Sequence, residues 1–262
     1  MAINIGRTGT AGRFIGGGAG VFQDNALRLY IDPYRYDCFT AETDSSMEDL
    51  SGWGNDLTCV NGARDFLNGF WYLDGSDDFA YRTDDSDFDF STNIDFSVQI
   101  WYKNLGSGST WYLIQKGYQY SSSVGWTIHY SDDAGKLYLH LGTETTHTQD
   151  GDETWDSGWI NLAVTVDRDS SVKFYKDGNL VETDIDNSTN HNLSNSGFLT
   201  IGGNNPFSST STVANEFNGY LGPILIYNGL VLSEDRIRQN FNVHRGIFGV
   251  WNKYILYLYM NN

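Results

Sequence analysis

Hydrophobic and polar residues alternate along much of this chain with a period of two, which is the pattern of β-strands with one buried face. Residues 96–102 and 160–166 show the alternation most clearly. Shorter strand-like segments recur between turn residues and lie at 27–31, 111–116, 125–130, 136–141, 172–176, 179–183 and 198–201. Asp177-Gly178 separates two of these segments, as a two-residue hairpin turn does, so the flanking strands are predicted to be antiparallel neighbours.

A helix is predicted over residues 233–243. Ser233 can cap its N-terminus, and the two acidic residues that follow favour the positive end of the helix dipole. Ile237 and Phe241 share one face because they lie four residues apart. Many short strands with a single helix indicate an all-β fold in which two antiparallel sheets pack face to face as a β-sandwich.

The composition agrees with this fold class and excludes several functions. The chain has 262 residues, with 15 Phe, 17 Tyr, 8 Trp and 29 Gly but only 3 Pro, which favours short strands and tight turns. The net charge of −17 opposes nucleic-acid binding. No apolar stretch is long enough to cross a bilayer, so no membrane insertion is expected. Cys38 and Cys59 are either a disulfide bridge or two small buried thiols.

The first 24 residues are rich in glycine, and ordering them costs too much backbone entropy for them to fold alone. They form either a floppy terminus or an arm that becomes ordered on a partner surface. Apolar and basic residues within the segment favour the arm. The candidate docking residues are Arg7, Arg13, Phe14, Ile15 and Phe22. No apolar signal-peptide core is present here, so synthesis in a cytoplasm is expected.

The other end of the chain is unusually apolar. Residues 254–260 have apolar side chains on both faces of a predicted strand, and Tyr254, Leu256 and Leu258 are its candidate docking residues. Such a strand must be covered by the sandwich or by a neighbouring subunit, which predicts docking or a homo-oligomer. The chain therefore divides into an arm (1–24), a sandwich (25–249) and a C-terminal extension (250–262).

The order of the strand motifs resembles a known family, the concanavalin A-like lectin and laminin G-like jelly-roll domains. Residues 71–79 (WYLDGSDDF) resemble its aromatic-x-FDG-x-DD-aromatic opening, and residues 96–103 (FSVQIWYK) resemble its FTI-x-AWVK strand. The remaining matching segments are 114–117, 125–128, 159–167, 174–181, 199–203, 217–222, 226–228 and 232–233. The resemblance implies a jelly-roll sandwich over residues 26–245.

Two further segments are similar to the version of this domain that is common in virion proteins of tailed phages. They are residues 49–56 (DLSGWGND) and 239–249 (QNFNVHRGIFG), the latter resembling a closing QNFNA-x-RGRFG with Val243 and Ile247 as departures. The resemblance implies a structural protein at the virion surface, either capsid decoration or a tail or fibre component. Its expected partners are other virion proteins. The alternative is a receptor-recognition adhesin that binds host surface polysaccharide.

The family resemblance also implies calcium. Relatives often hold Ca²⁺ between the acidic opening and the penultimate strand, and Asp74, Asp77 and Asp78 match that opening. On the closing strand this chain has Gly222-Pro223 where many relatives carry an acidic pair. The alternative is that Asp74-Gly75 forms a turn and the other two carboxylates are solvated. No cofactor is required by the sequence, and Ca²⁺ is the ion that this opening would take.

Hydrolysis and glycan binding are the remaining functions to weigh. Glu182, Asp184 and Asp186 resemble the catalytic E-x-D-x-E of laminarinase-type glucanases, but the last is Asp and the segment reads as an edge strand, so no catalytic residue is assigned. Glycan binding uses exposed aromatic rings. The aromatic residues that could supply such a surface are Trp111, Tyr118, Tyr120, Trp126 and Trp155.

Overall fold

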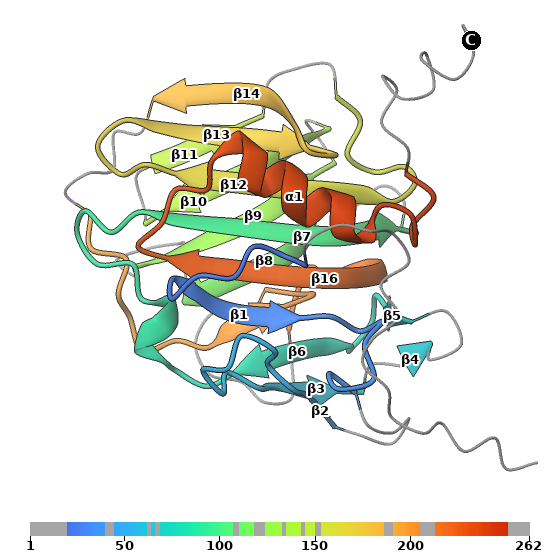
Figure 1. The fold of residues 1–262 in the computed structure, drawn as a ribbon. Coiled ribbons are helices and arrows are strands. Elements are labelled where there is room, and N and C mark those ends of the chain that lie inside the picture. Colours follow the sequence, from blue (N-terminus) through green and yellow to red (C-terminus); the bar gives the residue numbers. More distant parts are fainter. Residues whose placement is uncertain are drawn as a thin grey trace, which may run out of the picture.

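Within the residues that the structure describes, the computed structural model has two antiparallel sheets of eight strands each and one α-helix (Figure 1). The described residues are 20–39, 45–61, 64–65, 69–106, 110–117, 124–132, 135–142, 145–149, 153–185, 191–204 and 213–250. The two-sheet sandwich confirms the predicted fold class. The helix, α1 (Glu234–His244), lies across the outer face of one sheet (Figure 1).

Sheet A is the sheet that carries α1. Its strands in spatial order are β14 (Asn179–Ile185), β13 (Ser171–Lys176), β12 (Ile160–Val166), β7 (Phe96–Asn104), β16 (Asn218–Asn228), β5 (Phe70–Asp74) and β4 (Arg64–Asp65). The N-terminal strand β1 (Leu27–Ile31) also pairs with β16. The central strands β7 and β16 therefore connect early and late parts of the chain.

Sheet B forms the other layer. Its strands in spatial order are β11 (Thr145–Thr148), β10 (Lys136–Leu141), β9 (Gly125–Ser131), β8 (Trp111–Gly117), β15 (Leu199–Ile201), β6 (Phe79–Arg82), β3 (Leu57–Val60) and β2 (Ser46–Met47). A 3₁₀ turn, η1 (Ser86–Phe88), follows β6. The two sheets enclose one large core to which both contribute alternate residues, among them Ile100, Val164, Ile128 and Leu139.

The predicted hairpin is confirmed at Asp177-Gly178. Both residues have positive φ angles, 51° and 78°, as the two central residues of a type I′ turn require. The turn joins β13 and β14 as antiparallel neighbours. A side chain at Gly178 would also meet the ring of Phe241 on α1, so this glycine allows the helix to pack against the turn.

The prediction of one buried face for residues 96–102 and 160–166 is wrong, because every residue of both segments is buried. The inner faces point into the core. On the outer face, α1 packs its Ile237 into a second apolar cluster with Ala163 and Leu225. The alternating polar residues of these strands are thus covered by the helix and not by solvent.

The two cysteines are not joined by a disulfide bridge. Cys38 and Cys59 are both buried, so the structure realises the alternative without a bridge. Burial raises the pKa of the Cys38 thiol, which makes it a poor nucleophile at neutral pH.

Candidate functional site

The first described residues, 20–22, are fixed to the sandwich, and we call them the arm foot because they follow the predicted arm. Gln239 Nε2 donates to the Gly20 carbonyl at 2.8 Å. The Phe22 amide donates to Asn240 Oδ1 at 2.6 Å, and the Tyr227 hydroxyl donates to the Phe22 carbonyl at 2.8 Å. Three hydrogen bonds from α1 and β16 therefore hold the backbone of the arm foot.

A buried polar network between α1 and sheet A supports the arm foot. Asn240 Nδ2 donates to Gln99 Oε1 at 2.9 Å and to the Tyr227 hydroxyl at 3.1 Å. Gln99 Nε2 in turn donates to Asn161 Oδ1 at 2.8 Å and to the Ile237 carbonyl at 3.1 Å. The network connects α1 with β7, β12 and β16, so helix and foot are fixed to three strands of sheet A.

Phe22 packs on its own domain. Its ring stacks on Tyr227 with the centroids 6.2 Å apart, and the Arg236 guanidinium lies 4.2 Å from its centre. These contacts leave Phe22 half-buried on its own domain, and its docking on a partner stays a prediction. The boundary between arm and sandwich moves accordingly, since Val21 is also buried in the cluster beneath α1.

The C-terminal residue of α1, His244, contacts the residue that follows β1. His244 Nε2 lies 3.1 Å from Asp32 Oδ2, and the Tyr30 hydroxyl donates to the same oxygen at 3.0 Å. Burial, followed by the charge of Asp32, raises the pKa of Tyr30, so this hydroxyl stays protonated and remains a donor. The helix is thus held at Gln239 and Asn240, near its middle, and at its C-terminal residue.

Gly222 explains one departure from the family pattern. A side chain at this position would meet the Phe248 ring at 2.8 Å and Trp101 Cβ at 2.9 Å. Phe248 stacks on Trp101 with a centroid separation of 4.4 Å, above β16. Glycine is therefore required for the segment after α1 to close over the sheet.

The register of the same strand shows which residue lies opposite Asp74. In the pairing of β16 with β5, the residue opposite Asp74 is Asn218, and Gly222 lies beyond the end of the paired segment. Asn218 is thus the residue of β16 that the register places opposite Asp74, and the departure at Gly222-Pro223 lies outside this pairing.

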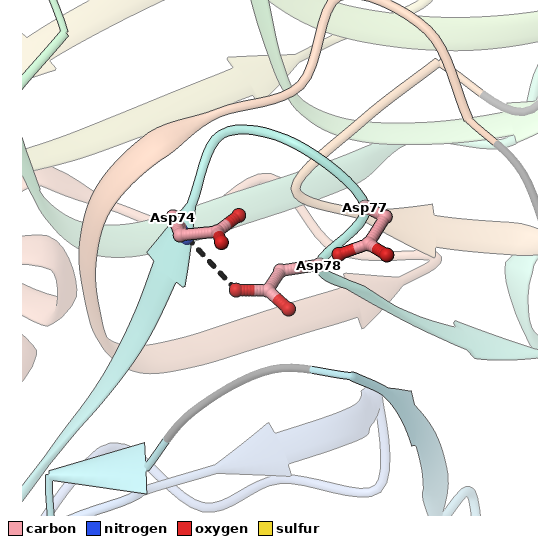
Figure 2. A group of neighbouring side chains, drawn as sticks. All are labelled: Asp74, Asp77 and Asp78. Carbon is pink, nitrogen blue, oxygen red and sulfur yellow. Dashed lines mark hydrogen bonds between the residues drawn. The ribbon is translucent and has the colours of Figure 1, made fainter.

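Asp74, Asp77 and Asp78 come together at the turn between β5 and β6 (Figure 2). One carboxylate oxygen from each lies within 4.8 Å of the others. The Asp74 amide donates to Asp78 Oδ2 at 2.8 Å. Asp78 is buried, which corrects the alternative that it is solvated. Burial, with the charges of Asp74 and Asp77 adding to it, raises the pKa of Asp78.

This donor set fits calcium in its chemistry. Ca²⁺ takes six to eight hard oxygen ligands at flexible geometry, and carboxylates are its usual protein ligands. Three crowded carboxylates repel one another, so a divalent cation would relieve that repulsion. The side chains that would hold the ion are those of Asp74, Asp77 and Asp78.

The predicted glycan-binding tryptophans do not face solvent. Trp111, Trp126 and Trp155 are each at most 2% exposed and lie in the core between the sheets. They cannot form a surface for sugars, and this prediction is wrong. These three tryptophans lie on inner strand faces or beneath a loop, where their large rings fill the space between the two sheets.

An exposed tryptophan lies elsewhere, in the loop between β2 and β3. Trp53 is 50% exposed, and the Arg28 guanidinium lies 3.7 Å from its ring centre. The Asp49 carboxylate holds the loop by accepting hydrogen bonds from the Tyr30, Ser51 and Asn55 amides. The loop lies within residues 49–56, the segment that resembles virion proteins. The sequence of this segment does not by itself predict that Trp53 is exposed.

Two of the three carboxylates considered for catalysis, Glu182 and Asp184, lie on β14, which is an edge strand of sheet A. Glu182 and Asp184 accept hydrogen bonds from the backbone amides of the residues that follow them. Asp184 also contacts His147 Nδ1 at 2.9 Å. These contacts assign the two carboxylates to the sheet edge.

Several predicted site residues lie outside the described part of the chain. They are Arg7, Arg13, Phe14, Ile15, Tyr118, Tyr120, Asp186, Tyr254, Leu256 and Leu258. Among the described residues, none of the helices has the length and apolar character needed to cross a membrane.

The family model described as concanavalin A-like lectin/glucanases superfamily matches residues 74–238. No curated protein matches the chain. The similar solved structures include botulinum neurotoxin type C, whose cell entry depends on two ganglioside molecules (16% identity, TM-score 0.58, covering 83% of this chain and 51% of that one). They also include the binding domain of Paraclostridial Mosquitocidal Protein 1 (16% identity, TM-score 0.59, covering 86% of this chain and 55% of that one). A third is a Trypanosoma rangeli sialidase (15% identity, TM-score 0.60, covering 88% of this chain and 35% of that one). This chain therefore spans about half or less of each of these structures, and at such identities they show a shared fold.

Proposed function

The chain belongs to the concanavalin A-like lectin/glucanase superfamily, and on that premise we propose that it is a structural subunit of a virion that docks on neighbouring subunits. The observation that carries the proposal is the arm foot. Gln239 and Asn240 belong to the segment that resembles the closing motif of tailed-phage virion proteins, and both hold the backbone from which the arm emerges. In this proposal, the motif fixes the point on the sandwich from which the arm extends.

An arm anchored in this way suits assembly. A glycine-rich segment gains order when a partner surface supplies the contacts that it lacks by itself. A fixed exit point on sheet A limits the volume that the arm searches, which lowers the entropy lost on docking. The sandwich acts as scaffold in this proposal, and we expect it to bind and not to hydrolyse.

Deleting residues 1–19 tests the proposal, because it removes the arm and leaves the foot. We expect the truncated protein to fold with an unchanged melting temperature and to be absent from purified particles. A second variant, with residues 1–19 replaced by a Gly-Ser segment of equal length, controls for length and should also be excluded. Normal incorporation of either variant would refute a docking role for the arm.

Glycan binding is the second candidate function, and Trp53 is the observation that favours it. A half-exposed indole held by a hydrogen-bonded loop offers a preformed apolar face, which is how many sites stack on sugar rings. Arg28 covers one side of the ring, and the Trp53 side chain is still 50% exposed. Host polysaccharide is the ligand class this would fit. The placement of Trp53 within the particle distinguishes the two functions.

We also propose that the three aspartates between β5 and β6 bind calcium. Saturating Ca²⁺, at about 100 times Kd, should stabilise the fold by about 2.7 kcal/mol and raise Tm by roughly 5 °C. Asp78→Asn should abolish the shift. Asp235→Asn, at a carboxylate with 94% of its side chain exposed, is the matched control and should retain it. An equal shift in both variants would place the ion elsewhere.

A further inference from the structure

Four partly exposed aromatic side chains gather on the outer face of sheet A, and we call them the aromatic patch. They are Phe70 and Tyr72 of β5, Tyr220 of β16, and Trp159, which precedes β12. Ring centroids are 4.7 Å apart for Phe70 and Trp159, and 5.2 Å apart for Tyr72 and Tyr220. The patch is a continuous apolar surface on the face of the sheet that also carries α1.

The end of the described chain leads directly onto this patch. Phe248 packs against Trp159 with a centroid distance of 4.4 Å and against Phe70 at 5.5 Å. Val250, the last described residue, belongs to the same apolar cluster. Its amide donates to the Arg245 carbonyl at 3.0 Å, which fixes the backbone of this last described residue beside the patch.

The segment that follows has the composition to cover an aromatic surface. Residues 254–260 read YILYLYM, with no charged residue among them. Three residues separate this segment from Val250, and three extended residues span about 10 Å. The segment can therefore reach the patch of its own chain. Tethering gives it an effective concentration of the order of millimolar, which favours it over the same segment of a second copy.

We propose that residues 254–260 bind the aromatic patch of the same chain. The proposal is independent of the virion role, since it rests on the patch, the position of Val250 and the apolar sequence beyond it. One face of the segment packs on Phe70, Tyr72, Trp159 and Tyr220. Its other face remains available to a neighbouring subunit, so the segment both covers the aromatic patch and offers an apolar contact.

Cross-linking in the full chain tests this placement. Cysteines at Tyr72 and Leu256 (Y72C and L256C) are treated with a short bismaleimide, and the expected product is a cross-linked monomer. The native thiols are buried, so they compete weakly. The matched control pairs L256C with a cysteine at Ile185, which is 69% exposed on the far edge strand β14, and should give no product.

The outcomes are distinct. A cross-linked dimer would make a second copy the occupant and overturn the proposal, as would equal cross-linking from Ile185. Hydrogen exchange of the unmodified full chain is independent of any variant: residues 254–260 should exchange at least about tenfold more slowly than in a free peptide of residues 251–262. Exchange at the rate of the peptide would also overturn the proposal.

Discussion

Replacing Asn240 by alanine is expected to lower the free energy of unfolding by about 2–4 kcal/mol. The substitution removes the acceptor of the Phe22 amide and the donor to Gln99 Oε1, and both of these groups lie in the interface beneath α1. A buried polar group left without its partner costs about 1–3 kcal/mol. The loss is measured by urea unfolding of the full chain.

The control for this variant lies on the same helix. Asn242 is exposed, so Asn242→Ala should change stability by less than about 0.5 kcal/mol. The Asn240 variant should also speed hydrogen exchange at the Phe22 amide, because the arm foot loses its bond to α1. Equal stability of the two variants, with unchanged exchange at Phe22, would mean that α1 does not hold the arm.

Acidification is expected to weaken the fold through two histidines on the outer face of sheet B. Burial, with His140 nearby, lowers the pKa of His129 to about 3, and burial, with His147 nearby, lowers the pKa of His140 to about 4. In the unfolded chain a histidine titrates near 6.5. Between about pH 6.5 and 4 the unfolded chain therefore binds protons that the folded protein does not.

Proton linkage sets the sign and the size of this change in the free energy of unfolding. Stability that is present above pH 6.5 is lost as the pH falls, by about 1.4 kcal/mol per pH unit for each histidine. The rings of His129 and His140 stack with centroids 4.9 Å apart, so two charges there would also repel. Carboxyl groups with raised pKa, such as Asp177, act in the opposite sense.

A matched variant isolates the histidine contribution. His129→Phe with His140→Phe keeps the stacked rings and removes both titrating groups. Its unfolding free energy should fall less steeply between pH 6.5 and 4 than that of the unchanged protein. Identical slopes in the double variant and the unchanged protein would show that the two histidines do not set the acid sensitivity.

The strands could be predicted from the sequence because their inner residues alternate with polar ones. β1, β10 and β12 begin and end where the pattern placed them, and α1 is displaced by one residue. The short strand β11 (Thr145–Thr148) was missed, since the letters TTHT carry no apolar alternation. Local pattern thus identified the elements that build the core.

The site was harder to predict because it depends on contacts between distant residues. The sequence marked Gln239 and Asn240 as part of a motif, but their partners Gly20 and Phe22 lie more than 200 residues away. Trp126 was assigned to the surface because a period-two pattern does not tell which face of a strand is buried. Strand register, which no short motif encodes, placed Asn218 opposite Asp74.

Electron cryomicroscopy of the purified particle tests the central claim, that this sandwich is a docked structural subunit with a directed arm. We expect many copies on a regular lattice, with residues 1–19 ordered against a neighbouring subunit and leaving the sandwich beside Gln239 and Asn240. A few copies at a tail tip, with Trp53 facing outward and the arm free of contacts, would contradict the account and assign the protein to host glycan recognition.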